Sequence, residues 1–442
     1  MKNIDFLFVY EVKSRELENI VLLKYELEKR GYTIELINTW DYLDKKVPKF
    51  KAKVVIPFAL YNDGTFKFIS TYIEKIDKLV NLYWEQVGSN REETDQTALF
   101  FLEGIAKQAV NVCWGNKTYT RLSKSCGIRE ENLILAGHLS LDFLRKELVD
   151  YYDSKEILFS KYNIPMDKKI CLFISSFSYV NLPETISNQI NDENYSVENF
   201  IKISVNSQKK IIDWIARYLE QYKDTIFIYR PHPAESSNIE LLKMAQKYKN
   251  FRVISELSVK QWILVSDIVY NWYSTSIAEI YAAKKPCYIL RPIEMPKEMD
   301  LGIFSNAEFI TKYTEFEKST VSNQYYFPVK KEKIEEYYYM DDKEAAYIKI
   351  CNKLEEVYKS DRYKLERLNK NQKLTVKNKI RLKLSKLPGG KKIVAVIEKN
   401  IYNRKSSFSE DMQSYMIEMS GKNKATKEEI ENIAQKFKEL LG

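Results

Sequence analysis

One of the two histidines in this 442-residue chain stands in the motif Arg230-Pro231-His232-Pro233, directly after the apolar run 225–229. Proline fixes its own backbone and biases the preceding residue toward extended geometry, so we expect a stiff loop at the carboxyl end of a strand. An arginine and a histidine held there could neutralise the charge that builds on a leaving phosphate group. The motif therefore predicts a phosphate site.

A hydroxyl cluster, Ser274-Thr275-Ser276, follows about forty residues later, between an apolar strand pattern and a helical pattern. Free N–H groups at a helix start favour a phosphate group, and small hydroxylated side chains let it approach closely. In the alternative interpretation, Ser276 and Glu279 form a capping box that binds nothing. The nearby Arg-Pro-His-Pro motif favours the phosphate interpretation.

Further candidates follow other expected strands. Transfer to a hydroxyl group needs a base, and Glu11 and Glu85 are two carboxylates at strand ends, with Glu11 slightly favoured. The alternative, which is favoured for each glutamate taken singly, is a solvated loop carboxylate. Ser175 and Ser176 suit a loop that approaches a diphosphate, or are an ordinary polar loop. His138 is either a substrate-binding or a structural imidazole.

Strand and helix patterns alternate twice along the chain, which predicts an α/β fold with parallel sheets covered on both faces. We expect an N-terminal Rossmann-like domain over residues 1–155, a second over 165–358 and a basic helical tail over 359–442. The expected strands are 3–10, 33–40, 52–59, 78–85, 110–115 and 132–137 in the first domain, and 169–174, 225–229, 251–254, 267–272 and 286–290 in the second.

The second half resembles the donor half of GT-B glycosyltransferases. The resemblance rests on Arg-Pro-His-Pro, a strand, Ser-Thr-Ser, a helix and then Lys285-Pro286-Cys287-Tyr288-Ile289. It is strongest to bacterial capsule, teichoic-acid and surface-carbohydrate enzymes, including sialyltransferase-like and CDP-glycerol glycerophosphotransferase-like members. It spans residues 1–360, with specific motifs only in the second half.

The resemblance implies two Rossmann-like domains that face a cleft, with the nucleotide donor bound by the second and the acceptor by the first. It implies that His232 and the cluster from Ser274 to Ser276 contact the donor's phosphates and that Glu279 reaches the ribose. It further implies that residues 256–258 border the base and that CMP- or CDP-linked donors are candidates.

The composition argues against several other classes of protein. Two histidines exclude a multi-histidine metal site, and five scattered cysteines argue against a disulfide framework or a zinc site. The sequence has no Asp-x-Asp, Walker or GxGxxG motif, which favours a metal-independent transferase without a cofactor over a kinase or a dinucleotide enzyme.

The net charge of +9 is concentrated late in the chain: residues 359–405 carry sixteen lysines and arginines against three acidic residues. Residues 374–387 place Val376, Ile380, Leu384 and Leu387 on one helical face, so this stretch could lie on an anionic membrane surface. A solvated helix or a partner-binding arm is the alternative. With no signal-peptide pattern and no apolar span, we expect a cytoplasmic protein, peripheral on the membrane, that does not bind nucleic acid.

These observations predict a glycosyltransferase, or a polyol-phosphate transferase, that moves a group from a nucleotide-activated donor to a glycan or lipid-linked surface-polysaccharide acceptor. Two alternatives are a UDP-sugar 2-epimerase and a non-catalytic nucleotide-sugar-binding scaffold. The residue types select neither the base, the transferred group nor the stereochemistry of transfer.

Overall fold

The computed structural model describes residues 2–39, 50–70, 73, 76–94, 99–180, 197–235, 238–322, 324–368, 380, 384 and 421–442. The chain divides into two compact units. The first comprises Met1–Gln86, Asp95–Leu139 and Glu336–Gly442, and the second comprises Val87–Thr94 and Ser140–Glu335. The chain thus enters the second unit at Ser140, before the domain boundary expected between residues 155 and 165, and the described residues after 359 group with the first unit.

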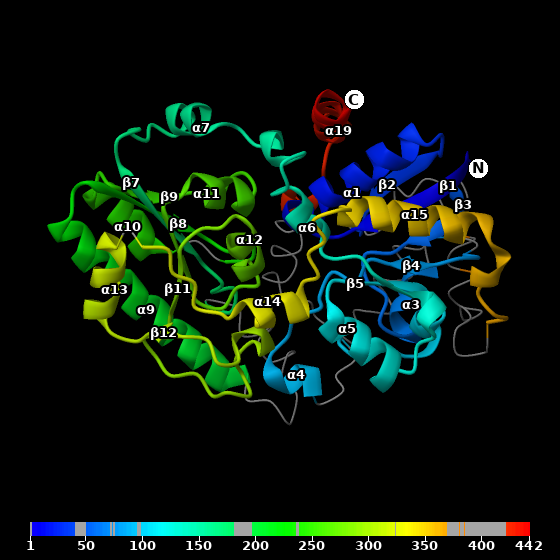
Figure 1. Ribbon diagram of the computed structural model, residues 1–442, viewed down its shortest axis with the longest axis horizontal. Coiled ribbons are helices and arrows are strands. Elements are labelled where there is room, and N and C mark those ends of the chain that lie inside the picture. Colours follow the sequence, from blue (N-terminus) through cyan, green and yellow to red (C-terminus); the bar gives the residue numbers. More distant parts are fainter. Residues whose placement is uncertain are drawn as a thin grey trace. The chain divides into compact units, whose positions relative to one another are not determined.

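The first unit is built on parallel strands in the order β2-β1-β3 and β4-β5-β6, and a parallel bridge from Val55 to Leu79 joins the two sets. The winding of the chain reverses between β1 and β3, which is the point where open α/β sheets bind ligands. The strands are β1 (Lys2–Tyr10), β2 (Ile34–Asn38), β3 (Phe50–Ile56), β4 (Val80–Asn81), β5 (Val110–Cys113) and β6 (Leu133–Leu135) (Figure 1).

The helices of the first unit include α1 (Lys13–Lys29), α3 (Asp63–Ser70), α5 (Asn116–Thr120), α15 (Ala346–Lys359) and α19 (Lys427–Leu441), with a π-helical turn at Arg121–Ser125. β1 is buried on both faces, since Phe6, Leu7 and Phe8 are at most 1% exposed. Such a continuous apolar run is typical of a parallel strand covered by helices. α15 packs against α1 although the second unit intervenes in the sequence.

The fourth strand is shorter than the sequence predicts. Instead of 78–85, only Val80–Asn81 pairs, because Tyr83 adopts a left-handed conformation, with φ 55°, that ends the strand. This conformation is costly for a bulky residue, and its side chain is held by a hydrogen bond from its hydroxyl group to the Leu99 carbonyl at 2.8 Å. Glu85 consequently lies in a loop.

Two glycines let the returning chain approach the first unit closely. A Cβ atom on Gly115 would lie 2.3 Å from the Tyr337 carbonyl, and one on Gly137 would lie 2.6 Å from the Tyr339 carbonyl oxygen. Gly137 also has φ 96°, which favours glycine. The Tyr339 N–H donates to the Trp114 carbonyl at 2.6 Å, so residues 337–339 are fixed against the ends of β5 and β6.

The second unit has one parallel sheet in the order β12-β11-β10-β7-β8-β9. Its winding reverses between β7 and β10, the arrangement of a Rossmann fold. The strands are β7 (Lys169–Ile174), β8 (Thr225–Arg230), β9 (Phe251–Val253), β10 (Ile268–Asn271), β11 (Cys287–Leu290) and β12 (Phe309–Ile310). The helices include α4 (Asn90–Thr94), α7 (Lys155–Lys161), α9 (Val197–Gln221), α10 (Ile239–Lys247), α11 (Val259–Val265), α12 (Ile277–Ala282) and α13 (Tyr313–Val321). Two short helices, α6 (Leu139–Asp142) and α14 (Lys331–Tyr337), lie where the chain passes between the units.

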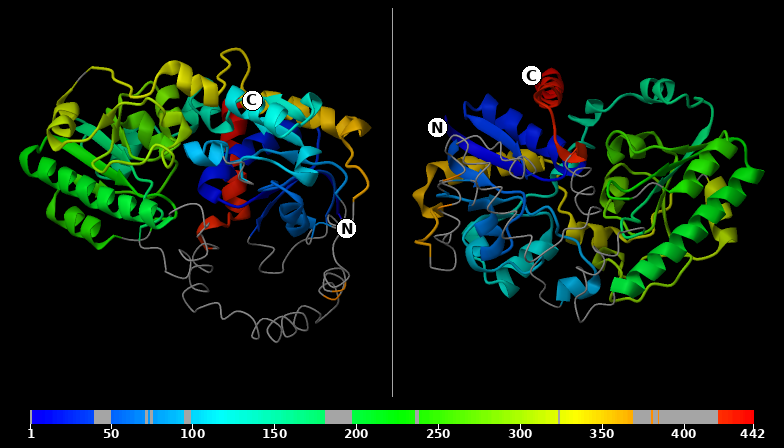
Figure 2. Two further views of the ribbon diagram at one scale, coloured as in Figure 1. Left: turned by 90° about the horizontal axis from the view of Figure 1, so that it is seen from below. Right: turned by 180° about the vertical axis from the view of Figure 1, so that it is seen from behind.

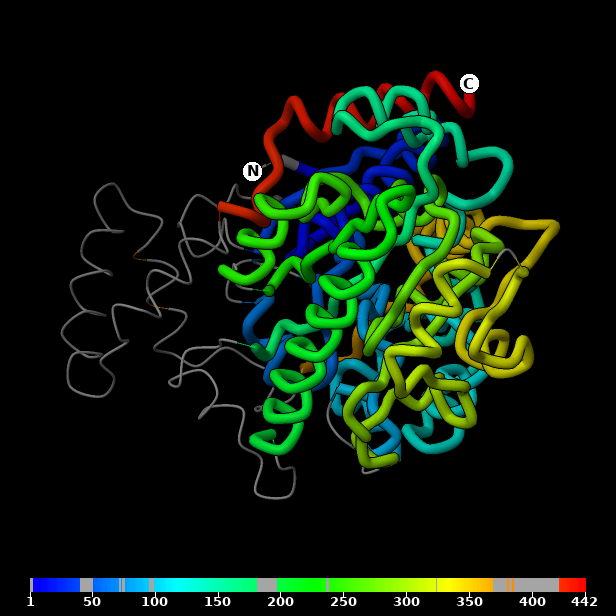
Figure 3. The backbone as a smooth tube through the Cα atoms, turned by 90° about the vertical axis from the view of Figure 1, so that its left-hand side faces the viewer, coloured from blue at the N-terminus to red at the C-terminus, as the bar shows by residue number. Residues whose placement is uncertain are grey.

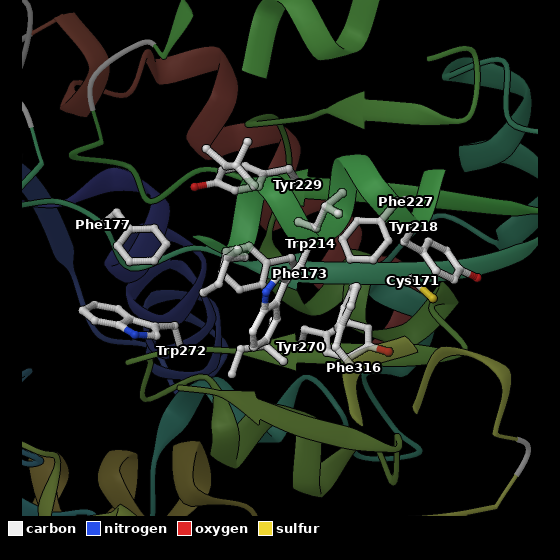
Figure 4. Close-up of a cluster of buried hydrophobic side chains, with 14 of the residues drawn as sticks. Cys171, Phe173, Phe177, Trp214, Tyr218, Phe227, Tyr229, Tyr270, Trp272 and Phe316 are labelled. Carbon is white, nitrogen blue, oxygen red and sulfur yellow. The ribbon is translucent and has the colours of Figure 1, made fainter. Parts of the chain in front are cut away.

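An aromatic core covers one face of this sheet. Phe173, Tyr229 and Tyr270 from three adjacent strands pack against Tyr218 of α9 and Phe316 of α13 (Figure 4). The alternate residues of β7, such as Leu172, are also fully buried, so both faces of the sheet are covered. This packing makes the carboxyl ends of β7, β8 and β10 a rigid edge.

The described C-terminal residues form α19, which contacts α1 (Figures 2 and 3). Of the amphipathic stretch expected at 374–387, only Ile380 and Leu384 are among the described residues, so this expectation lies outside what the structure describes. Within the described ranges, none of the helices is long and apolar enough to cross a bilayer.

Candidate functional site

The structure brings three of the expected site segments to one edge of the second unit's sheet. Ser175 and Ser176 follow β7, His232 follows β8, and Ser274 follows β10. These strands are neighbours in the order β10-β7-β8, and all are parallel, so the three loops emerge side by side. They flank the point where the winding of the sheet reverses.

Hydrogen bonds connect the β7 and β10 loops across this point. The Ser176 hydroxyl oxygen accepts the N–H of Tyr273 at 3.1 Å. Buried Asn271 accepts the Ser274 N–H at 2.9 Å and donates to the Ser274 carbonyl at 2.9 Å. The Ser274 hydroxyl oxygen accepts the Ser276 N–H at 3.2 Å. The hydroxyl cluster is therefore held in a defined turn, and Thr275 is exposed.

His232 has a defined tautomer. Its Nδ1 accepts the backbone N–H of Ala234 at 3.1 Å, so a neutral ring carries its proton on Nε2. The Nε2–H group can then donate to a phosphate oxygen while the backbone holds the other side of the ring.

Glu235 organises this site, and the sequence analysis did not single it out. Its Oε2 accepts the His232 N–H at 3.1 Å and the Ser175 hydroxyl, and its Oε1 accepts from the Tyr229 hydroxyl at 2.8 Å and from Gln208 Nε2 at 3.0 Å. Burial raises the pKa of Glu235, and the four hydrogen bonds oppose that rise. Its position three residues after His232, within the same stiff loop, was the available signal.

Arg230 is placed differently from the expectation. Its guanidinium donates to the carbonyl oxygens of Glu256, at 2.7 Å, and Leu257, and Arg230 is only 8% exposed. Leu257 is a non-glycine residue with φ 65°, and Trp262 Nε1 also donates to the Glu256 carbonyl, at 3.1 Å. Arg230 thus holds the loop after β9 in a strained conformation.

The capping box of the alternative interpretation does not form at Ser276 and Glu279. Ser276 makes no side-chain bond to the six-residue helix α12, because Glu279 is drawn into a buried cluster instead. Its Oε1 accepts the Ser140 hydroxyl at 3.1 Å, and Lys260 Nζ donates to the Ser140 oxygen at 2.9 Å. Burial raises the pKa of Glu279, and the charge of Lys260 lowers it.

The first unit carries a separate carboxylate cluster at the carboxyl end of β1. Arg15 pairs with Glu16, at 2.7 Å, and with Glu85, and the Glu16 Oε2 accepts the Glu11 N–H at 2.8 Å. Burial raises the pKa of Glu11; Arg15 lowers it and Glu85 raises it further. The structure thus brings Glu11 and Glu85 together around one arginine, and the sequence analysis missed Glu16, which is fully buried.

His138 belongs to an aromatic cluster of the first unit. Its ring centroid lies 4.0 Å from Trp114 and 5.8 Å from Tyr338. The Trp114 contact is tilted and the Tyr338 contact is edge-on, so the imidazole lies among rings of the first unit.

The described residues contain no group of three or more histidine, cysteine, aspartate or glutamate side chains placed to hold a metal ion. A depression of about 460 Å³ lies at the opposite, amino edge of the second sheet, beside Lys155, Asp267 and Pro286. It is remote from the loops that follow β7, β8 and β10, so we do not assign it to the candidate site.

No model of a known protein family matches the chain, and no curated protein matches it. Solved structures do. A variant of the wall teichoic acid polymerase TagF soaked with CDPG is 13% identical, with a TM-score of 0.50 over 80% of this chain and 89% of that chain. The fold is GT-B.

Two further solved structures have lower TM-scores. The S. aureus MnaA–UDP structure is 15% identical, with a TM-score of 0.47 over 80% of this chain and 95% of that chain. A UDP-N-acetylglucosamine 2-epimerase is 12% identical, with a TM-score of 0.47 over the same shares of the two chains. At such identities the likeness is one of fold alone. The parallel strand orders of the two units and the fold shared with TagF confirm the predicted α/β class with two Rossmann-like units.

Proposed function

We propose that the chain is a transferase of the GT-B fold that takes a group from a nucleotide-activated donor and passes it to a hydroxyl group of a surface polysaccharide. The observation that carries the proposal is the convergence of His232 with the hydroxyl loops of β7 and β10 at the winding reversal of the second sheet. Nucleotide phosphates bind at this point in Rossmann folds. The fold shared with TagF, whose structure was soaked with CDPG, supports a cytidine-type donor.

In this mechanism the second unit stabilises the leaving group. The bond between the transferred group and the donor's phosphate oxygen breaks, and the electron pair stays on that oxygen. His232 donates its Nε2–H to a phosphate oxygen, and Ser274 and Ser276 supply further donors. The dipole of the short helix α12 stabilises the phosphate charge less than that of a long helix would. His232 therefore makes the main contribution to this stabilisation.

The first unit supplies the base. As the acceptor oxygen forms its bond to the transferred group, its proton passes to a carboxylate, and Glu11 and Glu85 are the candidates. A raised pKa suits Glu11 to this role, because a base works best when its pKa is near the operating pH. Arg15 pairs with Glu85 and Glu16, and its positive charge compensates part of the negative charge of the three carboxylates.

A thermal-shift panel tests the donor site. CMP, CDP, UDP, GDP and ADP are each added to the wild type, to His232→Ala and to Asp224→Asn, a control just before the opposite end of β8. One nucleotide should raise the melting temperature of the wild type and the control but not that of His232→Ala, since a bound ligand stabilises by mass action. No shift with any nucleotide would reject the donor site.

Turnover separates the transferase from its two alternatives. Incubation with the activated form of the preferred nucleotide, followed by NMR, should show donor consumption that depends on an acceptor. Conversion of a free UDP-sugar at C2 would indicate the epimerase, and nucleotide binding without any reaction would indicate the scaffold.

The basic stretch 359–405 extends the proposal to a lipid-linked acceptor on an anionic membrane surface. Cosedimentation with vesicles tests this idea. The protein should bind vesicles rich in phosphatidylglycerol and release them at high salt, whereas equal binding to neutral vesicles would contradict an electrostatic contact.

A further inference from the structure

The start of α1 lacks a cap of its own. Its N-cap residue is Val12, which has no side-chain acceptor, so the first N–H groups of the helix need partners from elsewhere. Glu16 Oε2 accepts the N–H of Glu11, which precedes the N-cap residue, so this bond fixes the turn into the helix. A partner for the first N–H group of the helix itself comes from the far end of the sequence.

Asn423 supplies that partner. Its Oδ1 accepts the Lys13 N–H at 3.2 Å across 410 residues of sequence, and it is only 6% exposed. Its backbone oxygen accepts Asn38 Nδ2 at 3.0 Å at the end of β2, and the N–H of Ala425 donates to the Tyr10 hydroxyl at 3.1 Å at the end of β1. Residues 423–425 are therefore bound to the carboxyl ends of both strands.

The helix that follows is fixed at both ends. Lys13 pairs with Glu429 near the start of α1 and α19, and Lys29 Nζ donates to the Leu441 carbonyl at 3.3 Å near their ends. The two helices thus run parallel, and Tyr25 packs against the fully buried Phe437 between them, with ring centroids 6.2 Å apart. Figure 2 shows the red helix alongside the blue one. This attachment makes residues 421–442 an integral part of the first unit.

We propose that Asn423 is a positioning residue for the carboxylate cluster: by capping α1 it fixes the turn from Glu11 to Lys13, and thereby the direction of the Glu11 side chain. The catalytic part rests on the proposed function, in which Glu11 or Glu85 takes the acceptor's proton. If residues 421–442 instead obstructed the access of the acceptor to Glu11 and Glu85, loss of the Asn423 side chain would increase turnover.

Hydrogen–deuterium exchange on the full chain tests the cap without any assay of function. Asn423→Ala should raise the exchange rate of the peptide covering residues 11–16 by about fivefold, the factor that corresponds to loss of one cap. Asn423→Asp keeps the acceptor and should restore slow exchange. Gln435→Ala, which removes an exposed side chain of α19 that donates to Glu439, is the control and should leave exchange unchanged.

Turnover then tests the positioning role. In Asn423→Ala, kcat should fall about tenfold while the donor KM and the nucleotide thermal shift stay at wild-type values, and Asn423→Asp should recover kcat. Unchanged exchange at residues 11–16 would overturn the cap, and unchanged or increased kcat would overturn the positioning role. A wild type that turns over no donor would instead reject the proposed function, and the exchange result would still decide the cap.

Discussion

The Glu235 carboxylate accepts the backbone N–H of His232 at 3.1 Å and, through its other oxygen, the Tyr229 hydroxyl at 2.8 Å. One carboxylate thus joins the strand that enters the Arg-Pro-His-Pro loop to the histidine within it. His232 is therefore held by its neighbours on two sides, at its own N–H and at Nδ1, rather than by proline alone.

Glu235→Gln should loosen this loop. The amide replaces an acceptor oxygen by a donor, so one of the four donors loses its partner, at a cost of about 1–3 kcal/mol in unfolding free energy. Urea unfolding measures the stability, and the nucleotide thermal shift should shrink in parallel. The control is Glu220→Gln, an exposed glutamate at the end of α9, which should behave as the wild type. An unaltered nucleotide shift in Glu235→Gln would contradict its positioning role.

Glu16 should make stability depend on pH. Burial raises the pKa of Glu16 from 4.5 to about 7, so the folded chain binds this proton more tightly than the unfolded chain does. The stabilising contribution is complete below pH 4.5 and is lost as the pH rises through about 7. Relative to Glu16→Gln, the wild type should lose about 3 kcal/mol of unfolding free energy across this window.

Denaturant unfolding at a series of pH values checks the Glu16 prediction. The variant Glu28→Gln changes an exposed carboxyl group on the same helix and should reproduce the wild-type curve. If the curves of unfolding free energy against pH were parallel for the wild type and Glu16→Gln, Glu16 would have the same pKa in the folded and unfolded states, which contradicts the prediction.

Asp300→Asn should destabilise the second unit strongly. Asp300 accepts a hydrogen bond from Arg291 Nη2 at 2.7 Å, and the Arg291 side chain is 4% exposed among Trp272, Phe304 and other rings. Removing one partner leaves a buried charge, which costs about 3–5 kcal/mol. Asp224→Asn, in the exposed pair with Lys168, should change the unfolding free energy little. Urea unfolding measures both free energies. Equal losses in Asp300→Asn and Asp224→Asn would contradict the prediction.

Arg230→Lys should weaken binding of the nucleoside as much as binding of its diphosphate. A lysine cannot bond both carbonyls of residues 256 and 257 in the same fork, so the loop after β9 loses its support. If that loop borders the base, calorimetry will show a similar loss for both ligands. A loss confined to the diphosphate would indicate that Arg230 binds phosphate directly.

The strand pattern and the Arg-Pro-His-Pro motif were enough to predict two parallel α/β units and the edge at which His232 lies. Predictions from local sequence patterns failed where contacts between residues far apart in the sequence determine the structure. Ser276 and Glu279 fit a capping box, but Ser140, far away in the sequence, draws the glutamate away. The expected strand 78–85 ends early because Tyr83 adopts positive φ, which its apolar neighbours do not reveal.

Other site residues carried no local signal at all. Asn423 caps a helix 410 residues away, and its sequence context is an ordinary polar segment. A glutamate in a helix usually lies on the exposed face, so the sequence of α1 gives no sign that Glu16 is buried. Its burial depends on its contacts with Arg15 and with the Glu11 N–H. Pairings of this kind follow from tertiary packing and not from periodicity.

The central claim is that His232 binds the donor's phosphates. Calorimetric affinities of the preferred nucleoside diphosphate and of its parent nucleoside, for the wild type and His232→Ala, test this claim most directly. The diphosphate should bind the wild type at least tenfold more tightly than the nucleoside, and His232→Ala should remove most of that advantage, about 1.4 kcal/mol or more, while leaving nucleoside affinity unchanged. An undiminished diphosphate advantage in His232→Ala would contradict the account.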